Sequence, residues 1–380
     1  MKKSIYLDYA AATPMDPEIL KAMEPYFTQD FYNPSATYLA GQAERSALNE
    51  ARSGVASHLG CRPAEVIFTA GATEANNLAV QGIMRSFPEG EALISSLEHE
   101  SVLAPAKLFN YQEIPATGQG IVDTLALEEM LNDKTVLVSV MYVNNELGTI
   151  QPLREIAELL NKLRKSRLLA GNKTPIYLHT DAAQAGNYLD LHTSRLGVDL
   201  MSINGGKLYG PKQSGTLYIK AGVKLQPLIV GGGQEFGLRS GTENVAGDVG
   251  LSKALDIAQK MRGQESERVM NLRQQFEQMI SEKFPQAVVN GSSKHRAPHI
   301  ISVTFAGVDN ERLMMQLDEA GIICAVGSAC SASSAEASHV LSAIGLSPEE
   351  ARSTLRFSLG RQTTEADIQK TVKVLADFLN

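Results

Sequence analysis

Polar side chains that enzymes use in catalysis follow four successive apolar segments of the chain. They are Gly71-Ala72-Thr73, Glu98-His99, Asn144-Asn145-Glu146, and Asp181 with Gln184. Each of the four apolar segments has the length and character of a buried strand. One polar loop would mean little, because loops are usually polar. Acids, amides and an imidazole after four strands in succession predict a binding or catalytic site.

Two of these groups, together with a lysine further along the chain, suit a phosphorylated aldehyde cofactor. The GATE segment opens a helix at Ala72 and Thr73, and the N–H groups of a helix start can bind phosphate. Asp181 ends the segment IYLHTD, where a carboxylate can pair with a pyridinium nitrogen, as in pyridoxal phosphate (PLP) enzymes. Lys207 lies in the glycine-rich turn SINGGKLYG and can form a Schiff base. The alternatives are an ordinary helix start, a helix N-cap and a solvated lysine.

Arg356 and Cys330 are two further candidates near the C-terminus. In TLRFSLG, strand alternation separates Arg356 from Leu355 and Phe357, so its planar guanidinium points away from the core and can bind a carboxylate. The alternative is a surface ion pair. Cys330 lies in AVGSACSASSAEASHV, which has the small residues of a mobile loop rather than the apolar neighbours of a structural cysteine.

The elements around these residues predict an α/β fold. Between about residues 64 and 185, apolar strands alternate with helical stretches, which indicates a mostly parallel sheet covered by helices on both faces. Ligands of such sheets bind beyond the carboxyl ends of the strands. HIISVTFAGV, GIICAV and TLRFSLG predict strands of a second sheet. We therefore expect a large domain over 14–256 and a smaller α+β domain from 1–13 and 257–380, with a nucleophile loop at about 325–340. The N-terminal segment is expected beside the small domain or across the mouth of the site.

The composition narrows the class of protein. The chain has 380 residues and a net charge of −7, without a basic stripe, so no direct contact with nucleic acid is expected. Cys61, Cys324 and Cys330 form no metal-binding spacing, and so few cysteines suit a reducing compartment. Cys61 and Cys324 are expected to be packed and inert. No signal peptide or membrane-length segment is apparent, which predicts a cytoplasmic protein and no membrane.

The chain resembles the cysteine desulfurases of the NifS/IscS type, which are class-V aminotransferase-like, fold-type I PLP enzymes. The resemblance extends over essentially the whole length. Nine motifs carry it in family order: IYLDYAAATPMDP, FTAGATEANNLA, EHESVL, VNNELGTIQP, HTDAAQA, KLYGPK, GGGQEFGLRSGTEN, GSACSAS and RFSLGRQTT.

The resemblance assigns roles to individual residues. Lys207 would bind PLP as a Schiff base, Asp181 would pair with the pyridine nitrogen and Gln184 would contact the phenolic oxygen. His99 would stack on the ring and assist proton transfer. The phosphate would contact Ala72, Thr73 and Asn204, and Thr242 from a second subunit of a homodimer. Arg356, helped by Asn145, would bind the carboxylate of L-cysteine. Cys330 would take the sulfur as a persulfide, releasing L-alanine, and pass it to an iron–sulfur scaffold or a tRNA-thiolation enzyme.

The chain departs from the family pattern around the lysine. The family usually has Ser-x-His-Lys, where this chain has Asn204 and Gly206 before Lys207. Gln213 stands where a glycine is usual and Tyr38 where histidine is frequent. We hypothesise that Gln213, Tyr38 or a water fills the space at Gly206.

Two other functions remain open on the sequence. A neighbouring PLP activity, such as an aminotransferase or a cysteine or selenocysteine lyase, needs Lys207 and Asp181 but not the Cys330 loop. A scaffold whose PLP site has decayed is favoured by Gly206 alone.

Overall fold

A seven-stranded sheet forms the centre of the larger part of the molecule. The computed structural model describes residues 4–327 and 338–379. The strands lie in the order β2-β8-β7-β6-β5-β3-β4. They are β2 (Val66–Thr69), β3 (Glu91–Ser95), β4 (Tyr111–Ile114), β5 (Thr135–Ser139), β6 (Tyr177–Asp181), β7 (Leu200–Asn204) and β8 (Gly215–Ile219). Six of these seven strands run in the same direction, and β8 runs opposite to them. The predicted α/β class with a mostly parallel sheet is confirmed.

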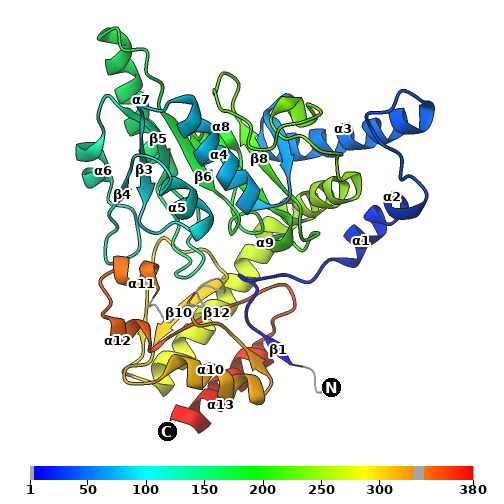
Figure 1. Ribbon diagram of the computed structural model, residues 1–380. Coiled ribbons are helices and arrows are strands. Elements are labelled where there is room, and N and C mark those ends of the chain that lie inside the picture. Colours follow the sequence, from blue (N-terminus) through cyan, green and yellow to red (C-terminus); the bar gives the residue numbers. More distant parts are fainter. Residues whose placement is uncertain (1–3, 328–337, 380) are drawn as a thin grey trace.

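Helices cover both faces of this sheet (Figure 1). On one face, α3 (Leu39–Leu59), α7 (Leu153–Leu169) and the first half of α9 (Val245–Lys283) pack on strand residues that include Leu93 and Val138. On the other face, α4 (Ala72–Ser86) and α5 (Glu100–Ala106) pack on the alternate residues Ile94 and Leu137. Successive strand residues point to opposite faces, so an apolar run with cover on both sides is buried throughout.

A three-stranded antiparallel sheet lies in the smaller part of the molecule (Figure 1). Its order is β12-β10-β9, with β9 (Val288–Val289), β10 (Ile300–Thr304) and β12 (Thr354–Ser358). The GIICAV segment meets this sheet only at its end, where Ala325 and Arg356 of β12 exchange backbone hydrogen bonds. Its strand β11 (Ile322–Ile323) pairs instead in parallel with β1 (Ile5–Tyr6), because the N-terminal segment supplies the backbone partners along that edge.

Helix α9 is shared by the two parts. Its N-terminal half contributes Leu251 and Leu255 to the core of the large sheet, and its C-terminal half contributes Phe276 and Ile280 to a second core under the small sheet. The predicted boundary after residue 256 falls inside this continuous helix. The division into 14–256 and 1–13 with 257–380 therefore stays a prediction.

Shorter elements complete the described chain. They are α1 (Pro17–Met23), α2 (Pro25–Thr28), η1 (Pro63–Glu65), α6 (Thr124–Met130), α8 (Thr193–Leu196), η2 (Gly205–Lys207), η3 (Glu235–Gly237), α10 (Asn310–Glu319), α11 (His339–Ala343), α12 (Pro348–Ala351) and α13 (Glu365–Leu379). A capping box of Thr364 and Asp367 precedes α13, with the Asp367 carboxylate accepting from Thr364 N at 2.9 Å. No helix within 4–327 or 338–379 is both long and apolar enough to cross a membrane.

Candidate active site

Nine of the predicted site residues line one cavity. Its volume is about 590 Å³ including the open mouth. The nine residues are Ala72, Thr73, His99, Asn145, Asp181, Gln184, Asn204, Lys207 and Arg356. Eight of them follow the ends of β2, β3, β5, β6 and β7, and Arg356 comes from β12 in the smaller sheet. The carboxyl ends of parallel strands meet at one edge of the sheet, which explains why residues so far apart in sequence converge.

The start of α4 provides one end of the cavity. Gly71 is its N-cap, with φ 129°, and no side chain caps the helix. A residue with a Cβ is strained at such a φ, so glycine suits this sharp turn from strand to helix. An α-helix leaves its first N–H groups without intrahelical partners. Together with the helix dipole, these groups suit a phosphate.

Asp181 provides a carboxylate at the end of β6. It is 6% exposed. Its Oδ1 accepts from Ala183 N at 2.9 Å and its Oδ2 accepts from Asn76 Nδ2 at 2.7 Å. These two donors hold the carboxylate in place at the cavity, where it can pair with a pyridinium nitrogen. The N-cap alternative fails, because no helix follows β6 at this point.

Lys207 lies in η2, in the loop that joins β7 to β8. Its Nζ donates to the carbonyl oxygen of Ala10 at 2.8 Å and to that of Ala11. Thr13 Oγ1 donates to the Gly206 carbonyl oxygen at 3.0 Å. The N-terminal segment therefore lies across the lysine, which confirms one of the two positions expected for it.

His99 is the N-cap of α5. Its Nδ1 accepts from Ser101 N at 3.1 Å and lies 2.9 Å from Ser101 Oγ. The preceding Glu98 is fully buried, and its Oε1 accepts from Met141 N. Burial, and after it the nearby Asp181 carboxylate, raises the pKa of Glu98 well above its ordinary value. Burial therefore favours the neutral form of the Glu98 carboxyl group.

Arg356 is buried, with 2% exposure. It points away from the apolar core of the small sheet, as predicted, but it is covered rather than solvated. Its Nη2 donates to Asp8 Oδ1 at 2.7 Å, and its Nη1 donates to the Asn145 carbonyl oxygen at 3.0 Å. Its Nε has no hydrogen-bond partner within the described residues. A buried guanidinium that lines the cavity with a remaining donor suits a carboxylate ligand.

Gln184 and Asn204 are already engaged by neighbouring groups. Gln184 Nε2 donates to the Ala10 carbonyl oxygen at 2.9 Å, and Gln184 Oε1 lies 3.3 Å from His299 Nε2. Burial lowers the pKa of His299 to about 3, so this imidazole is neutral. Asn204 Oδ1 accepts from Gly206 N at 3.1 Å and so holds the turn before the lysine.

Of the predicted site residues that the structure describes, Thr242 does not line this cavity. Thr242 is exposed at the surface, so its predicted contact from a second subunit stays a prediction. Cys330 lies outside the described residues. Burial raises the pKa of both Cys61 and Cys324 to about 12, which agrees with the inert role predicted for them.

The space at Gly206 has room for a Cβ, and the hypothesis that Gln213, Tyr38 or a water fills it stays a prediction. A Cβ built there meets Asn204 Oδ1 and Lys212 Cγ, each at 3.5 Å, which is ordinary contact. Neither Gln213 nor Tyr38 of the same chain is among the nearest atoms. Gln213 takes a left-handed φ of 57°, which explains why glycine suits that position better.

Sequence reasoning missed several residues that shape the site. Asp8 balances the charge of Arg356, and Asn76 and Ser101 contact Asp181 and His99. Asp8 belongs to the motif IYLDYAAATPMDP and Ser101 to EHESVL, so the motifs contained the signal although the roles did not follow from it.

The arrangement fits PLP. A lysine amine, an ionised carboxylate and an uncapped helix start face the same cavity, and these are the groups that an aldehyde, a pyridinium and a phosphate require. Together with the α/β fold they define the class-V aminotransferase type of enzyme. The chain matches the family Aminotransferase class-V over residues 5–371 and belongs to it.

Within this family, relatives over the full length are cysteine desulfurases. The chain is 40% identical to cysteine desulfurase IscS of Dictyoglomus turgidum, over 99% of this chain and 94% of the relative. It is 39% identical to the human cysteine desulfurase, over 98% of this chain and 80% of the relative. A solved NifS-like protein superposes with a TM-score of 0.90 at 30% identity, over 99% of both chains. A structure described as SspA in complex with cysteine superposes with a TM-score of 0.81 at 34% sequence identity, over 94% of this chain and 99% of that one. The chain is a member of the IscS/NifS group of the family.

Proposed function

We propose that this protein is a PLP-dependent cysteine desulfurase, which converts L-cysteine to L-alanine and leaves the sulfur as a persulfide on Cys330. The observation that carries the proposal is the convergence of Lys207, Asp181 and Arg356 on one cavity. These three residues supply an attachment for the cofactor, a partner for its ring and a partner for the carboxylate of an amino acid.

The residues that would hold PLP surround Lys207, which would attach it. Asp181 would pair with the ring nitrogen, His99 would stack on the ring and Gln184 would contact its phenolic oxygen. Ala72 and Thr73 at the start of α4, with Asn204, would contact the phosphate. When bound, PLP supplies an electron sink for the carbon that loses its proton.

The remaining residues would bind and process the substrate. The Arg356 guanidinium would bind the L-cysteine carboxylate through N–H groups that its bonds to Asp8 and to the Asn145 carbonyl oxygen leave over. Lys207 Nζ, within reach of the Ala10 carbonyl oxygen at 2.8 Å, would carry the α-proton. The Cys330 thiolate would take the substrate sulfur, forming an S–S bond as the C–S bond breaks. One thiol and one cysteine give one persulfide and one alanine, so atoms and protons balance.

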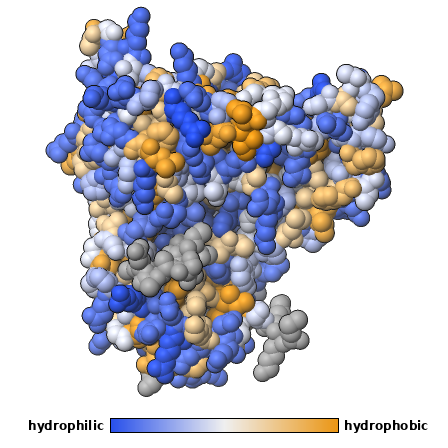
Figure 2. Space-filling view, in the orientation of Figure 1, coloured by the Kyte–Doolittle hydropathy of each residue, from blue (hydrophilic) through white to orange (hydrophobic). Residues whose placement is uncertain are grey.

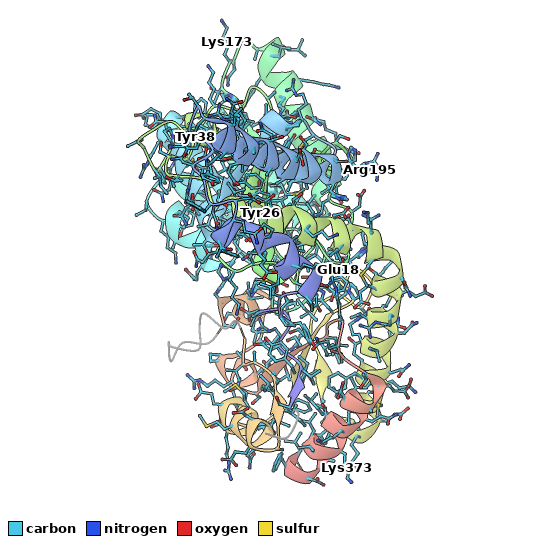
Figure 3. The ribbon with its side chains drawn as sticks, turned by 90° about the vertical axis from the view of Figure 1, so that its right-hand side faces the viewer. Glu18, Tyr26, Tyr38, Lys173, Arg195 and Lys373 are labelled. Atoms are coloured by element: carbon cyan, nitrogen blue, oxygen red, sulfur yellow. The ribbon has the colours of Figure 1, made fainter. Side chains whose placement is uncertain are left out.

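A homodimer is part of the proposal, with Thr242 reaching the partner's phosphate site. Supporting it, large apolar side chains are exposed near α2 and the start of α3: Phe27 at 59%, Phe31 at 65% and Leu39 at 84%. Figure 2 shows apolar surface at this end of the molecule, and Figure 3, turned by 90°, labels Tyr38 at the same end. Contiguous exposed apolar groups mark association surfaces.

The destination of the sulfur is proposed from the resemblance. The acceptor would be an iron–sulfur scaffold or a tRNA-thiolation enzyme in the cytoplasm. Persulfide chemistry supports such a transfer, since a persulfide passes its outer sulfur to another thiol by exchange.

Alanine release from L-cysteine tests the function. PLP-loaded wild type and a Cys61→Ala control are expected to form alanine, and a Cys330→Ala variant is expected to form none while retaining the absorbance of Lys207-bound PLP. Alanine from all three would favour a lyase or another PLP activity without a protein thiol. Failure to bind PLP would favour the decayed scaffold.

A further inference from the structure

A chain of hydrogen bonds joins Asp181 to His99 through two residues with no role in the proposed reaction. Asn76 lies in α4 and Ser101 in α5, and they are 0% and 8% exposed. Asn76 Nδ2 donates to Asp181 Oδ2 at 2.7 Å and to Ser101 Oγ at 2.8 Å. Ser101 Oγ lies 2.9 Å from His99 Nδ1. The carboxylate and the imidazole of the site are therefore connected by direct contacts.

The chemistry of Asp181 fixes the direction of this chain. An ionised carboxylate only accepts, so the Asn76 amide must turn its nitrogen toward Asp181. The second hydrogen of the same nitrogen then points to Ser101 Oγ. This orientation leaves Asn76 Oδ1 without a hydrogen-bond partner in the described part of the chain. The Ser101 hydroxyl, having accepted from Asn76, keeps its own proton for His99 Nδ1.

A second donor gives the same answer for His99. The backbone N–H of Ser101 points at His99 Nδ1, with 3.1 Å between the nitrogens, and a backbone amide can only donate. A protonated Nδ1 would face this N–H with a hydrogen of its own. In the neutral ring Nδ1 is therefore the acceptor, and the ring proton is on Nε2.

We propose that Asn76 and Ser101 are positioning residues that orient Asp181 and hold His99 as its Nε2–H tautomer. This inference rests on the proposed function and assigns a role within the same site. With Nδ1 occupied, His99 acts as an N–H donor at Nε2 and does not take the substrate proton as a base. That proton is left to Lys207.

The tautomer can be measured in the PLP-loaded protein. Uniform ¹⁵N labelling of histidine and a long-range ¹H–¹⁵N correlation spectrum distinguish protonated from unprotonated ring nitrogens, and a His99→Gln variant identifies the His99 signals by their loss. We expect a protonated Nε2 and an unprotonated Nδ1 in the wild type. A protonated Nδ1 in the neutral ring would overturn the proposal without any variant.

Reversing the direction of the hydrogen bonds from Asn76 through Ser101 tests whether these two residues set the tautomer of His99. Asn76→Asp puts an oxygen in place of the amide nitrogen, so the Ser101 hydroxyl must donate to residue 76 and can only accept from His99. We expect Nδ1-protonated His99 to become observable. Asn76→Asp combined with Ser101→Ala removes the hydroxyl and is expected to restore the wild-type pattern.

Asn77→Asp is the matched control. Asn77 is the next residue of α4, and its Nδ2 donates to the Thr73 carbonyl oxygen at 2.9 Å and to the Ser101 carbonyl oxygen at 3.5 Å, but not to the Ser101 hydroxyl or to Asp181. It adds the same charge and is expected to leave the His99 pattern unchanged. An unchanged Asn76→Asp spectrum, or an effect that persists without the Ser101 hydroxyl, would refute the path. The spectrum does not depend on turnover, so the two proposals can fail separately. A wild-type protein that has Nε2–H His99 but forms no alanine from L-cysteine would reject the proposed function and leave the tautomer assignment standing.

Discussion

The Asp8–Arg356 ion pair predicts how the site balances charge before substrate binds. The Arg356 and Asp8 side chains are 3% and 15% exposed, with 2.7 Å between Nη2 and Oδ1. Removing one partner of a buried pair costs about 3–5 kcal/mol. Asp8→Asn removes the charge and keeps an acceptor oxygen, so we expect about half of that cost, about 2 kcal/mol.

This loss of stability converts to a measurable shift in melting temperature. With an unfolding entropy of about 2.1 cal/mol/K per residue, a chain of 380 residues has about 0.8 kcal/mol/K, so the Asp8→Asn variant should melt about 2.5 °C lower. A ligand carboxylate would replace the missing charge. L-alanine should therefore bind the variant about tenfold more tightly than the wild type, and raise its melting temperature more.

Thermal unfolding with and without L-alanine measures both effects. Asp16→Asn is the matched control, because Asp16 lies in the same N-terminal segment and pairs with Arg361 at 3.2 Å, away from the cavity. Alanine should stabilise this control no more than the wild type. An Asp8→Asn variant that melts like the wild type and binds alanine equally or less well would refute the charge-balance reasoning.

Three further predictions concern the cofactor site, the thiols and acid stability. Gly206→His should tighten PLP binding about tenfold, because a Cβ meets only ordinary contacts there and the imidazole adds a donor for phosphate. Gly206→Ala is the control and should leave the dissociation constant for PLP unchanged. Equal dissociation constants for the wild type and both variants would contradict this. Iodoacetamide at pH 7.5 should leave Cys61 and Cys324 unlabelled in the native protein, since their pKa values of about 12 lie above that pH and only the thiolate reacts. Labelling as fast as in the unfolded chain, measured by peptide mass spectrometry, would contradict this prediction. Burial lowers the pKa of His179 to about 3, so the unfolded chain binds the extra proton below about pH 6.5 and stability falls on acidification, by about 2 kcal/mol at pH 5. The difference in urea unfolding free energy between pH 7 and pH 5 should therefore be smaller in His179→Gln by about that amount, and an unchanged difference would show that His179 does not titrate in this way.

The part of the site on the large sheet could be predicted because strand ends are visible in the sequence. Asp181 and His99 each follow an apolar segment, and parallel strands bring such positions to one edge. Lys207 was found by its glycines and by its place in the turn after the next strand. Local pattern and topology together determine these positions.

The contacts across the cavity could not be predicted in the same way. Asp8 pairs with Arg356 across 348 positions of sequence, through a β1 strand of only two residues. A strand this short leaves no pattern of period two to detect. The position of this N-terminal segment determines both the burial of Arg356 beside Asp8 and the pairing of β11 with β1.

The hydrogen-bond chain of Asn76 and Ser101 depends on how α4 packs against α5. Both residues read as ordinary polar positions of helices, where most polar side chains are solvated. Their burial depends on packing between two helices, which periodicity in one helix does not reveal. His299 directly precedes β10, and its contact with Gln184 joins residues 115 positions apart, which no local pattern reveals.

Sulfur transfer to Cys330 is tested most directly by mass spectrometry after a single turnover. The PLP-loaded protein would be mixed with one equivalent of L-cysteine without reductant, alkylated and digested. We predict that the peptide containing Cys330 gains the mass of one sulfur atom, in amounts equal to the alanine released, and that the peptides of Cys61 and Cys324 gain none. Alanine released with no added sulfur on Cys330, or with the sulfur on another cysteine, would contradict the proposed reaction.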